Sequence, residues 1–233
     1  MARTGFFHHI GTFLLFAATV LLIITDISAP VVARISMLRV DLDGSTGSSN
    51  THPAVTFGTF GWCTENVASD DSKSCSKHMI GYDPISVIQN NVRNVDVGDL
   101  SADTSKGLTN VMVLHPVATG LAFISFAMAL GAGLVGSFLA SLGALITFIV
   151  TLVALVCDFV SFSIVMHEVN SANSGSRASW GTASWTTLVS AICSLLATII
   201  LFFTCCSARI HRKREKRVVA KNDAGVPAQR GWF

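Results

Sequence analysis

Three kinds of residue in this 233-residue chain could do chemistry: a pair of cysteines, an aspartate inside an apolar segment, and histidines. Cys63 and Cys75 fall in the stretch FGTFGWCTENVASDDSKSC, with eleven residues between them, and could form a disulfide or hold a metal ion. Asp158 stands in a long uncharged run, where a carboxylate could bind a proton or a partner. Imidazoles titrate near neutral pH. Which chemistry is open to each residue depends on where a membrane places it.

Apolar residues are concentrated in four blocks, and only 13% of the residues are charged, against about 25% in a typical soluble domain. The first block is Phe6–Thr25. The stretch 117–157 has no acid or base and as one helix would be about 60 Å long, so it must fold back within a bilayer, at the glycines of 131–136. The last block is Trp185–Thr204. We expect four membrane helices, the first retained rather than cleaved as a signal peptide, because it is long and Pro30 follows the candidate cleavage site.

The orientation follows from the basic residues after the fourth block: Arg209, Arg212, Lys213, Arg214, Lys216 and Arg217. The positive-inside rule places this tail, and hence the N-terminus, in the cytoplasm of a multi-pass protein. The expected organisation is N-terminus and first helix at 1–27, extracellular loop at 28–110, second helix at 111–133, short cytoplasmic turn at 134–137, third helix at 138–166, second extracellular loop at 167–184, fourth helix at 185–206 and basic cytoplasmic tail at 207–233.

This topology favours a disulfide between Cys63 and Cys75, the two cysteines of the external loop, where oxidising conditions preserve such bonds. In the chain-entropy picture, closing this ring contributes about 3 kcal/mol. Two free thiols are the simpler alternative. A metal site with His78 fits less well, because two cysteines and one histidine at this spacing match no usual tetrahedral set, and we expect no metal.

Local patterns predict a small sheet and a helix in the external loop. Apolar residues alternate with charged ones over 38–43, as in a strand with one covered face, and 54–62 could pair with it. Gly58 and Gly61 suggest bulges or close backbone approaches. Asp83 and Pro84 are typical of a helix start. The apolar stripe of this helix, which would lie on the sheet or on the membrane surface, is Ile85, Ile88, Val92 and Val95, and 96–109 is expected to be a linker.

The order FGTFGWC…CS…GYDP, followed by LHPVATGLAFISFAMAL, resembles the fungal PalI/Sur-type family of four-helix membrane proteins, over almost the whole chain to about residue 206. The positions that carry the resemblance are Gly58, Gly61, Trp62, Cys63, Cys75, Gly81, Tyr82, His115, Pro116 and Asp158. The architecture is more distantly similar to that of claudins: an all-α four-helix membrane bundle with a small extracellular β-sheet and a short helix. Because Trp62 abuts Cys63 and a Gly-Leu-Trp element is absent, tight-junction sealing is not carried over.

The resemblance implies a non-enzymatic plasma-membrane protein that works through partners. Members of the family help an alkaline-pH receptor in ambient-pH signalling, or organise cortical membrane domains such as eisosomes and maintain the cell wall. The implied partners are membrane lipids and other plasma-membrane proteins, with no cofactor and no nucleic acid. The chain also has no glycine-rich phosphate loop, HExxH or GxSxG.

Asp158 has two interpretations. A carboxylate inside a membrane helix costs a few kcal/mol at mid-bilayer and tends to face a partner within the bundle. It could respond to protons, bind a partner, or serve a small channel or transporter component. It could instead fix helix packing through a hydroxyl such as Thr119. Asp26 would be a plain interfacial residue, and His115-Pro116 a helix start.

Two further features concern contacts within the membrane. Small residues recur every fourth position, at Gly136, Ala140 and Ala144 and again at Gly133, Ser137 and Ser141, for packing within the bundle or in a homo-oligomer. Cys205 and Cys206 precede the basic run 209–217, which suggests acylation and binding of anionic lipids.

Overall fold

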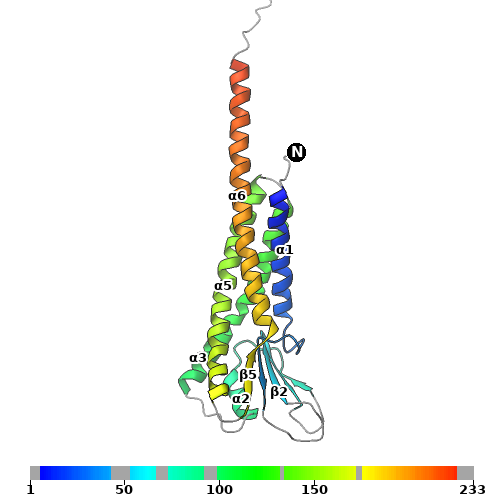
Figure 1. Ribbon diagram of the computed structural model, residues 1–233, viewed down its shortest axis with the longest axis vertical. Coiled ribbons are helices and arrows are strands. Elements are labelled where there is room, and N and C mark those ends of the chain that lie inside the picture. The colour runs from blue at the N-terminus through cyan, green and yellow to red at the C-terminus, as the bar shows by residue number, and fades with distance from the viewer. Residues whose placement is uncertain are drawn as a thin grey trace, which may run out of the picture.

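The computed structural model describes residues 6–42, 53–66, 73–91, 99–131, 134–171 and 175–224. Four of its helices are long and apolar enough to cross a membrane: α1 (Phe6–Asp26), α4 (Leu114–Leu130), α5 (Leu134–Ser171) and α6 (Thr182–Ala224). α1 packs against α4 and α6, and α5 packs against the same two helices, so the four close into a bundle (Figure 1). The expected four-helix membrane fold with a small antiparallel sheet is confirmed.

The two longest helices extend beyond the segments expected for them. α5 begins at Leu134, inside the segment 134–137 expected as a turn, and it continues past residue 166 to Ser171. Its last turns bring Val165 and Val169 into the core under the sheet, which explains why the helix leaves the apolar belt. α6 passes residue 206 and extends beyond the other helices at the end opposite the sheet (Figure 1).

A five-stranded antiparallel sheet stands at one end of the bundle, with the strand order β4-β3-β2-β1-β5. Its strands are β1 (Leu38–Asp41), β2 (Ala54–Gly58), β3 (Gly61–Glu65), β4 (Lys73–Cys75) and β5 (Arg177–Trp180). The expected pairing of 54–62 with the first strand is confirmed for β2, and the stretch then turns at Thr59 and Phe60, so that Gly58 pairs with Gly61 across a hairpin. β5, from the second loop, was not expected and pairs with β1.

The inner face of the sheet packs on helices. Phe57 and Ile85 are fully buried there with Phe162 of α5. α2 (Pro84–Asn91) therefore lies on the sheet, and the Oδ1 atom of Asp83 accepts hydrogen bonds from the N–H groups of Ile85 and Ser86, which confirms the predicted helix start. Val92 and Val95 lie outside the described residues.

The prediction of a linker at 96–109 is wrong from residue 99 onward. It forms α3 (Asp99–Asn110), continued by the 3-10 turn η1 (Val111–Val113) into α4. α3 packs against α5, which gives this polar segment a partner for helix formation that its own composition does not reveal.

Part of the outer face of the sheet is covered by the chain that leaves α1. Residues 27–36 cross it, and Ala29 and Ala33 are buried against Cys63. A Cβ atom at Gly58 would collide with the backbone of Ala29, so glycine is needed at this close approach. We call the sheet, α2, α3 and this covering segment the cap.

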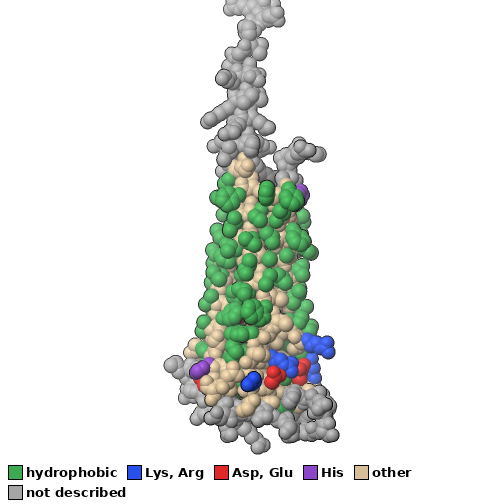
Figure 2. Space-filling view, viewed as in Figure 1, with side chains coloured by type: hydrophobic (Ala, Val, Ile, Leu, Met, Phe, Trp, Pro, Cys, Tyr) green, Lys and Arg blue, Asp and Glu red, His purple; other side chains and the backbone are tan. Residues whose placement is uncertain are grey.

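Side chains on the bundle surface form a broad apolar belt (Figure 2). Inside the bundle, small residues bring the helices together: Ala140 and Ala144 of α5 are buried with Ala129 and Ala197. Ser141 is buried as well. These members of the small-residue rows pack within the bundle, as the simpler of the two interpretations had it.

Replacing Gly58 by alanine should destabilise the cap by about 1–3 kcal/mol, because the added Cβ must displace the backbone of Ala29. Gly107 of α3 is the matched control: a Cβ there meets no atom within 4 Å, so Gly107→Ala should be neutral or stabilising by about 0.5–1 kcal/mol. Thermal unfolding of the purified variants in detergent measures both. Equal melting temperatures for the two variants would contradict the close approach.

Candidate functional site

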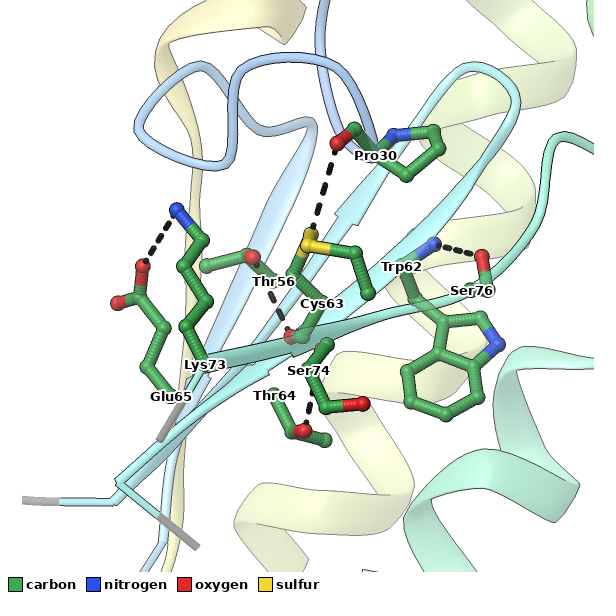
Figure 3. The surroundings of a disulfide bond; sticks show 10 residues. Pro30, Thr56, Trp62, Cys63, Thr64, Glu65, Lys73, Ser74 and Ser76 are labelled. Atoms are coloured by element: carbon green, nitrogen blue, oxygen red, sulfur yellow. Dashed lines mark hydrogen bonds and ion pairs between the residues drawn. A yellow bond between two sulfur atoms is a disulfide. The ribbon is translucent and has the colours of Figure 1, made fainter. Parts of the chain in front are cut away.

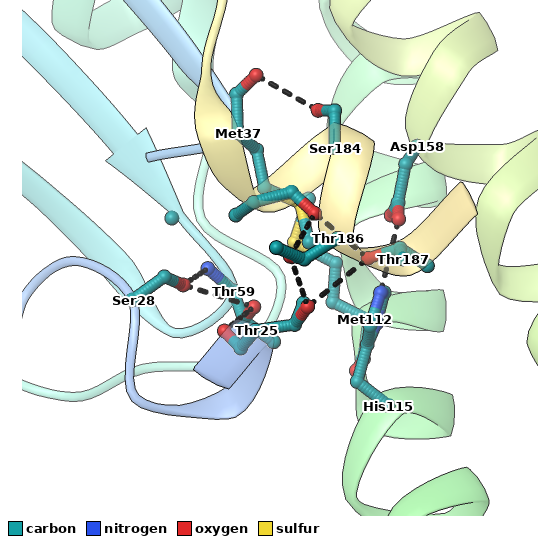
Figure 4. Close-up of polar contacts among 12 residues, drawn as sticks. Thr25, Ser28, Met37, Thr59, Met112, His115, Asp158, Ser184, Thr186 and Thr187 are labelled. Atoms are coloured by element: carbon teal, nitrogen blue, oxygen red, sulfur yellow. Dashed lines mark hydrogen bonds and ion pairs between the residues drawn. The ribbon is translucent and has the colours of Figure 1, made fainter. Parts of the chain in front are cut away.

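A buried pair of ionisable side chains joins α4 to α5 beneath the cap. Nε2 of His115 lies 3.0 Å from Oδ2 of Asp158, and the two side chains are 0% and 3% exposed (Figure 4). The two atoms are not aligned for a hydrogen bond, and the contact is an ion pair when the imidazole is protonated. The other ring nitrogen, Nδ1, lies 3.2 Å from the carbonyl oxygen of Met112. Because both nitrogens face acceptors, only the imidazolium form can donate to both.

This geometry corrects the partner proposed for Asp158. The hydroxyl of Thr119 donates instead to Oδ2 of Asp26, at 2.6 Å, so Asp26 is a bundle contact of α1 rather than a plain interfacial residue. Asp26 also acts electrostatically on His115. One histidine thus lies in the field of two carboxylates from different helices, which draws α1, α4 and α5 together.

His115 links this pair to the 3-10 turn η1 through the Met112 carbonyl. The expected helix start at His115-Pro116 agrees with α4, which begins one residue earlier at Leu114. The proline stands in the first turn, where a missing N–H removes no helical hydrogen bond.

Tyr82 connects the first-loop motif to the layers around it. Its hydroxyl donates to the carbonyl oxygen of Gly58 at 2.7 Å, and its own carbonyl accepts from the Thr109 hydroxyl at 2.6 Å. Its ring lies parallel to that of Phe57, with centroids 6.2 Å apart. Burial, and secondarily the negative charge of Asp158, raises the pKa of Tyr82 well above its ordinary value of 10.0. The hydroxyl therefore stays a donor in alkaline solution.

Gly81 fits the same arrangement. Its φ of +69° lies in the region that glycine adopts without strain, and a Cβ would collide with the side chain of Asn110. Gly81 and Tyr82 thus place the loop after β4 against the end of α3.

Hydroxyl groups attach the β2–β3 turn to the ends of α1 and α6. The Thr59 hydroxyl donates to the carbonyl oxygen of Thr25 at 2.9 Å, and the Thr25 hydroxyl lies 2.9 Å from that of Thr186 and 3.2 Å from that of Thr187 (Figure 4). On the other side, the Ser184 hydroxyl donates to the carbonyl oxygen of Met37. Each buried polar group named here has a partner from another element, as a water-poor environment demands.

The disulfide joins the two strands at the β4 edge of the sheet. Cys63 of β3 and Cys75 of β4 are direct cross-strand partners with an S–S distance of 2.04 Å, so the predicted bond is present (Figure 3). The Cys63 side chain faces residues 29–33, with Pro30 beside it. Trp62, on the opposite face, packs at the edge of the inner core. The motif therefore fastens the covering segment and the sheet together.

The structure brings most of the resemblance-bearing residues to one end of the molecule. The glycines, Trp62, the cysteines and Tyr82 lie in the cap, with His115 and Asp158 directly beneath it. Cys205 and Cys206 lie at the opposite end, the first buried and the second exposed. The side chains of 209–217 are outside the described part of the chain.

Four spanning helices and a disulfide-closed cap define a multi-pass membrane protein with a structured domain at one surface. A family model described as the SUR7/PalI family matches residues 7–200, and the chain belongs to this family. The predicted resemblance is confirmed.

Two relatives carry names that refer to pH. The pH-response regulator protein palI/prr-5 of Neurospora crassa is 29% identical over 215 residues, which cover 90% of this chain and 26% of that protein. The pH-response regulator protein palI/RIM9 of Pyricularia oryzae is 32% identical over 119 residues, covering 51% of this chain and 14% of that protein. The chain thus spans about a quarter or less of the length of these relatives.

Separating the His115–Asp158 pair should cost much more than separating an exposed one. His115→Gln or Asp158→Asn alone should lower the free energy of unfolding by roughly 3–5 kcal/mol, because each leaves its buried partner uncompensated. The double variant should lose clearly less than the sum, since two amides can hydrogen-bond to each other.

The matched control is the exposed pair Arg39 and Asp41, at 2.8 Å, where the same kind of cycle should give less than about 1 kcal/mol. Denaturant titration of the protein in micelles measures both cycles. Additive losses at His115 and Asp158 would show that the two side chains do not interact.

Tyr82 can be titrated selectively because it is the only tyrosine of the chain. The ultraviolet absorbance of tyrosinate should stay absent in the folded protein as the pH passes 10.0, and appear near that value after denaturation. Because unfolded Tyr82 ionises while folded Tyr82 remains protonated, the free energy of unfolding should fall as the pH rises above 10.0.

Tyr82→Phe should remove this pH dependence while costing about 1–3 kcal/mol at neutral pH, since the Gly58 carbonyl loses its donor. Tyrosinate absorbance near pH 10.0 in the folded protein would show that Tyr82 is accessible to solvent.

Proposed function

We propose that this protein is a non-enzymatic plasma-membrane accessory of ambient-pH signalling, with both termini in the cytoplasm and the cap outside. The observation that carries the proposal is the match over 90% of the chain to a relative named as a pH-response regulator. That match takes in both the bundle and the cap. The shared unit would therefore hold other plasma-membrane proteins of the pathway rather than transform a substrate.

The arrangement of charges supports a role in binding. On the outer face of the sheet, Arg39 pairs with Asp41 and Glu65, and Lys73 pairs with Glu65, at 2.8–3.6 Å. Beneath the cap, the carboxylate of Asp158 is turned toward His115. These ionisable groups pair with one another within the fold. Such a polar surface suits the rim of a contact with another protein.

The end opposite the cap is proposed to engage lipid. α6 leaves its spanning segment at Ser207, and six basic residues follow within the next ten positions. In the proposed orientation these bases face the anionic cytoplasmic leaflet, at about 1 kcal/mol for each base near the surface. Cys206, exposed at the end of the span, is the better placed of the two acylation candidates.

A small channel or transporter component that uses Asp158 is the second candidate, and the geometry supports it less. Asp158 is 3% exposed and faces His115, so it would have to exchange a protein partner for an ion. Ion flux through liposomes containing the purified protein, abolished by Asp158→Asn, would favour this candidate.

The proposal predicts that cells without this protein fail to activate their alkaline-response transcription factor by proteolysis after a shift to high external pH. The wild-type chain should restore the processing. A Cys63→Ser, Cys75→Ser double variant should restore less, because residues 29–33 lose the crosslinked sheet on which they pack. Immunoblots of the factor, with surface labelling of each variant, measure both effects.

Gly107→Ala, at a position with open space around it, is the control that should restore processing fully. Normal processing in cells without the protein would exclude a role in this pathway. Defects in cortical membrane domains or the cell wall in the same cells would then indicate the organising role that the family resemblance also implies.

A further inference from the structure

The apolar belt of the bundle is shorter on the side of α1 than on the side of α4. The Asp26 carboxylate, at the last residue of α1, meets Thr119 of α4 at 2.6 Å. The spanning segment that includes α4 begins at Val111, eight residues earlier, which corresponds to about 12 Å along the helix axis. On the cap side, helix α1 therefore stops about 12 Å short of the residue at which the neighbouring span begins.

The chain after α1 occupies this missing part of the belt with exposed apolar side chains. Ile27 and Val31 follow Ile23, which lies on the lipid-facing side of α1, at intervals of four residues, and Val31 is 58% exposed. Turn hydrogen bonds follow the end of the helix, from the N–H of Ile27 to the Ile23 carbonyl and from the N–H of Val31 to the Ser28 carbonyl. Exposed apolar side chains thus extend from α1 into the cap.

The loop that follows β4 adds to the same surface. Met79 and Ile80 are exposed, Ile80 by 55%, although both are apolar. The N–H of Met79 donates to the carbonyl oxygen of Phe60, in the turn whose Thr59 contacts the end of α1. This loop therefore lies between the end of α1 and the end of α3, where Gly81 meets Asn110.

The segment 27–34 has two distinct sides. Ala29 and Ala33 are buried against Cys63, whereas Ile27, Val31 and Arg34 point outward. Arg34 has no ion-pair partner among the residues that the structure describes. An apolar surface followed by an unpaired base suits the boundary between acyl chains and phosphate groups.

We propose that Ile27, Val31, Met79 and Ile80 form a collar that inserts into the lipid interface at the cap end of the bundle, with Arg34 at the level of the phosphates. The occupant is lipid because the collar continues the belt of a helix that already faces lipid, at a level where α4 is still in its span. The disulfide and the cap glycines hold this collar in place through Ala29 and Ala33. The collar sets the depth and tilt of the cap at the bilayer surface, whichever side of the membrane the cap faces.

The test uses the purified full-length chain in phosphatidylcholine vesicles, with the four free cysteines replaced by alanine and the disulfide kept. An environment-sensitive fluorophore is attached at Val31→Cys or Ile80→Cys, both exposed positions. Phe123→Cys, exposed in the middle of α4, is the control for lipid contact. Arg177→Cys, exposed at the end of β5 far from α6, is the control for water.

Lipids brominated on their chains should quench the label at positions 31 and 80 strongly, as at 123, whereas aqueous iodide should quench mainly the label at 177. Arg34→Glu should reduce the lipid quenching at position 31. Labels at 31 and 80 that behave like the label at 177 would overturn the proposal and leave the surface for a protein partner. Because only purified protein and lipid are present, this outcome is independent of any role in pH signalling.

Discussion

A polar side chain in the interior of a lipid-facing bundle has no water with which to form hydrogen bonds, and this constraint organises the junction between bundle and cap. His115 and Asp158 face each other between α4 and α5, and Asp26 brings α1 into the same group of ionisable side chains. On the cap side of them, the hydroxyls of Tyr82 and Thr59 donate to backbone carbonyls of neighbouring elements, and the Thr25 hydroxyl meets that of Thr186 on α6. The pairing of these groups fastens the cap to the helix ends beneath it.

The glycine-aromatic-cysteine cluster holds three layers of the cap together. The covering segment lies outside, the sheet in the middle, and α2 with the end of α5 inside. Gly58 lets the outer layer approach the middle one, and its carbonyl receives the hydroxyl of Tyr82. One short stretch of sequence thus contacts both of its neighbours. This explains why small, aromatic and crosslinking residues stand so close together in an otherwise apolar chain.

The features that the sequence predicted well are local or set by the environment. Apolar length gives the spans, alternation gives β1, and Asp83 with Pro84 gives the start of α2. The disulfide followed from topology and from the small number of external cysteines. The partner of Asp158 could not be predicted, because the vertical register between α4 and α5 decides whether Thr119 or His115 reaches it. Strand β5 was missed for a similar reason: a stretch of four residues between two helices becomes a strand only beside β1.

The connection between β5 and α6 has a mechanical consequence. Only Gly181 separates the edge strand of the cap from a helix that runs unbroken for 43 residues, about 65 Å, through the bundle and beyond it. Gly181 itself is wedged against the backbone of Ser36, so the joint has little freedom to swivel. A rotation or tilt of the sheet edge would therefore also rotate or tilt the far end of α6. The two surfaces of the membrane are joined by one stiff element.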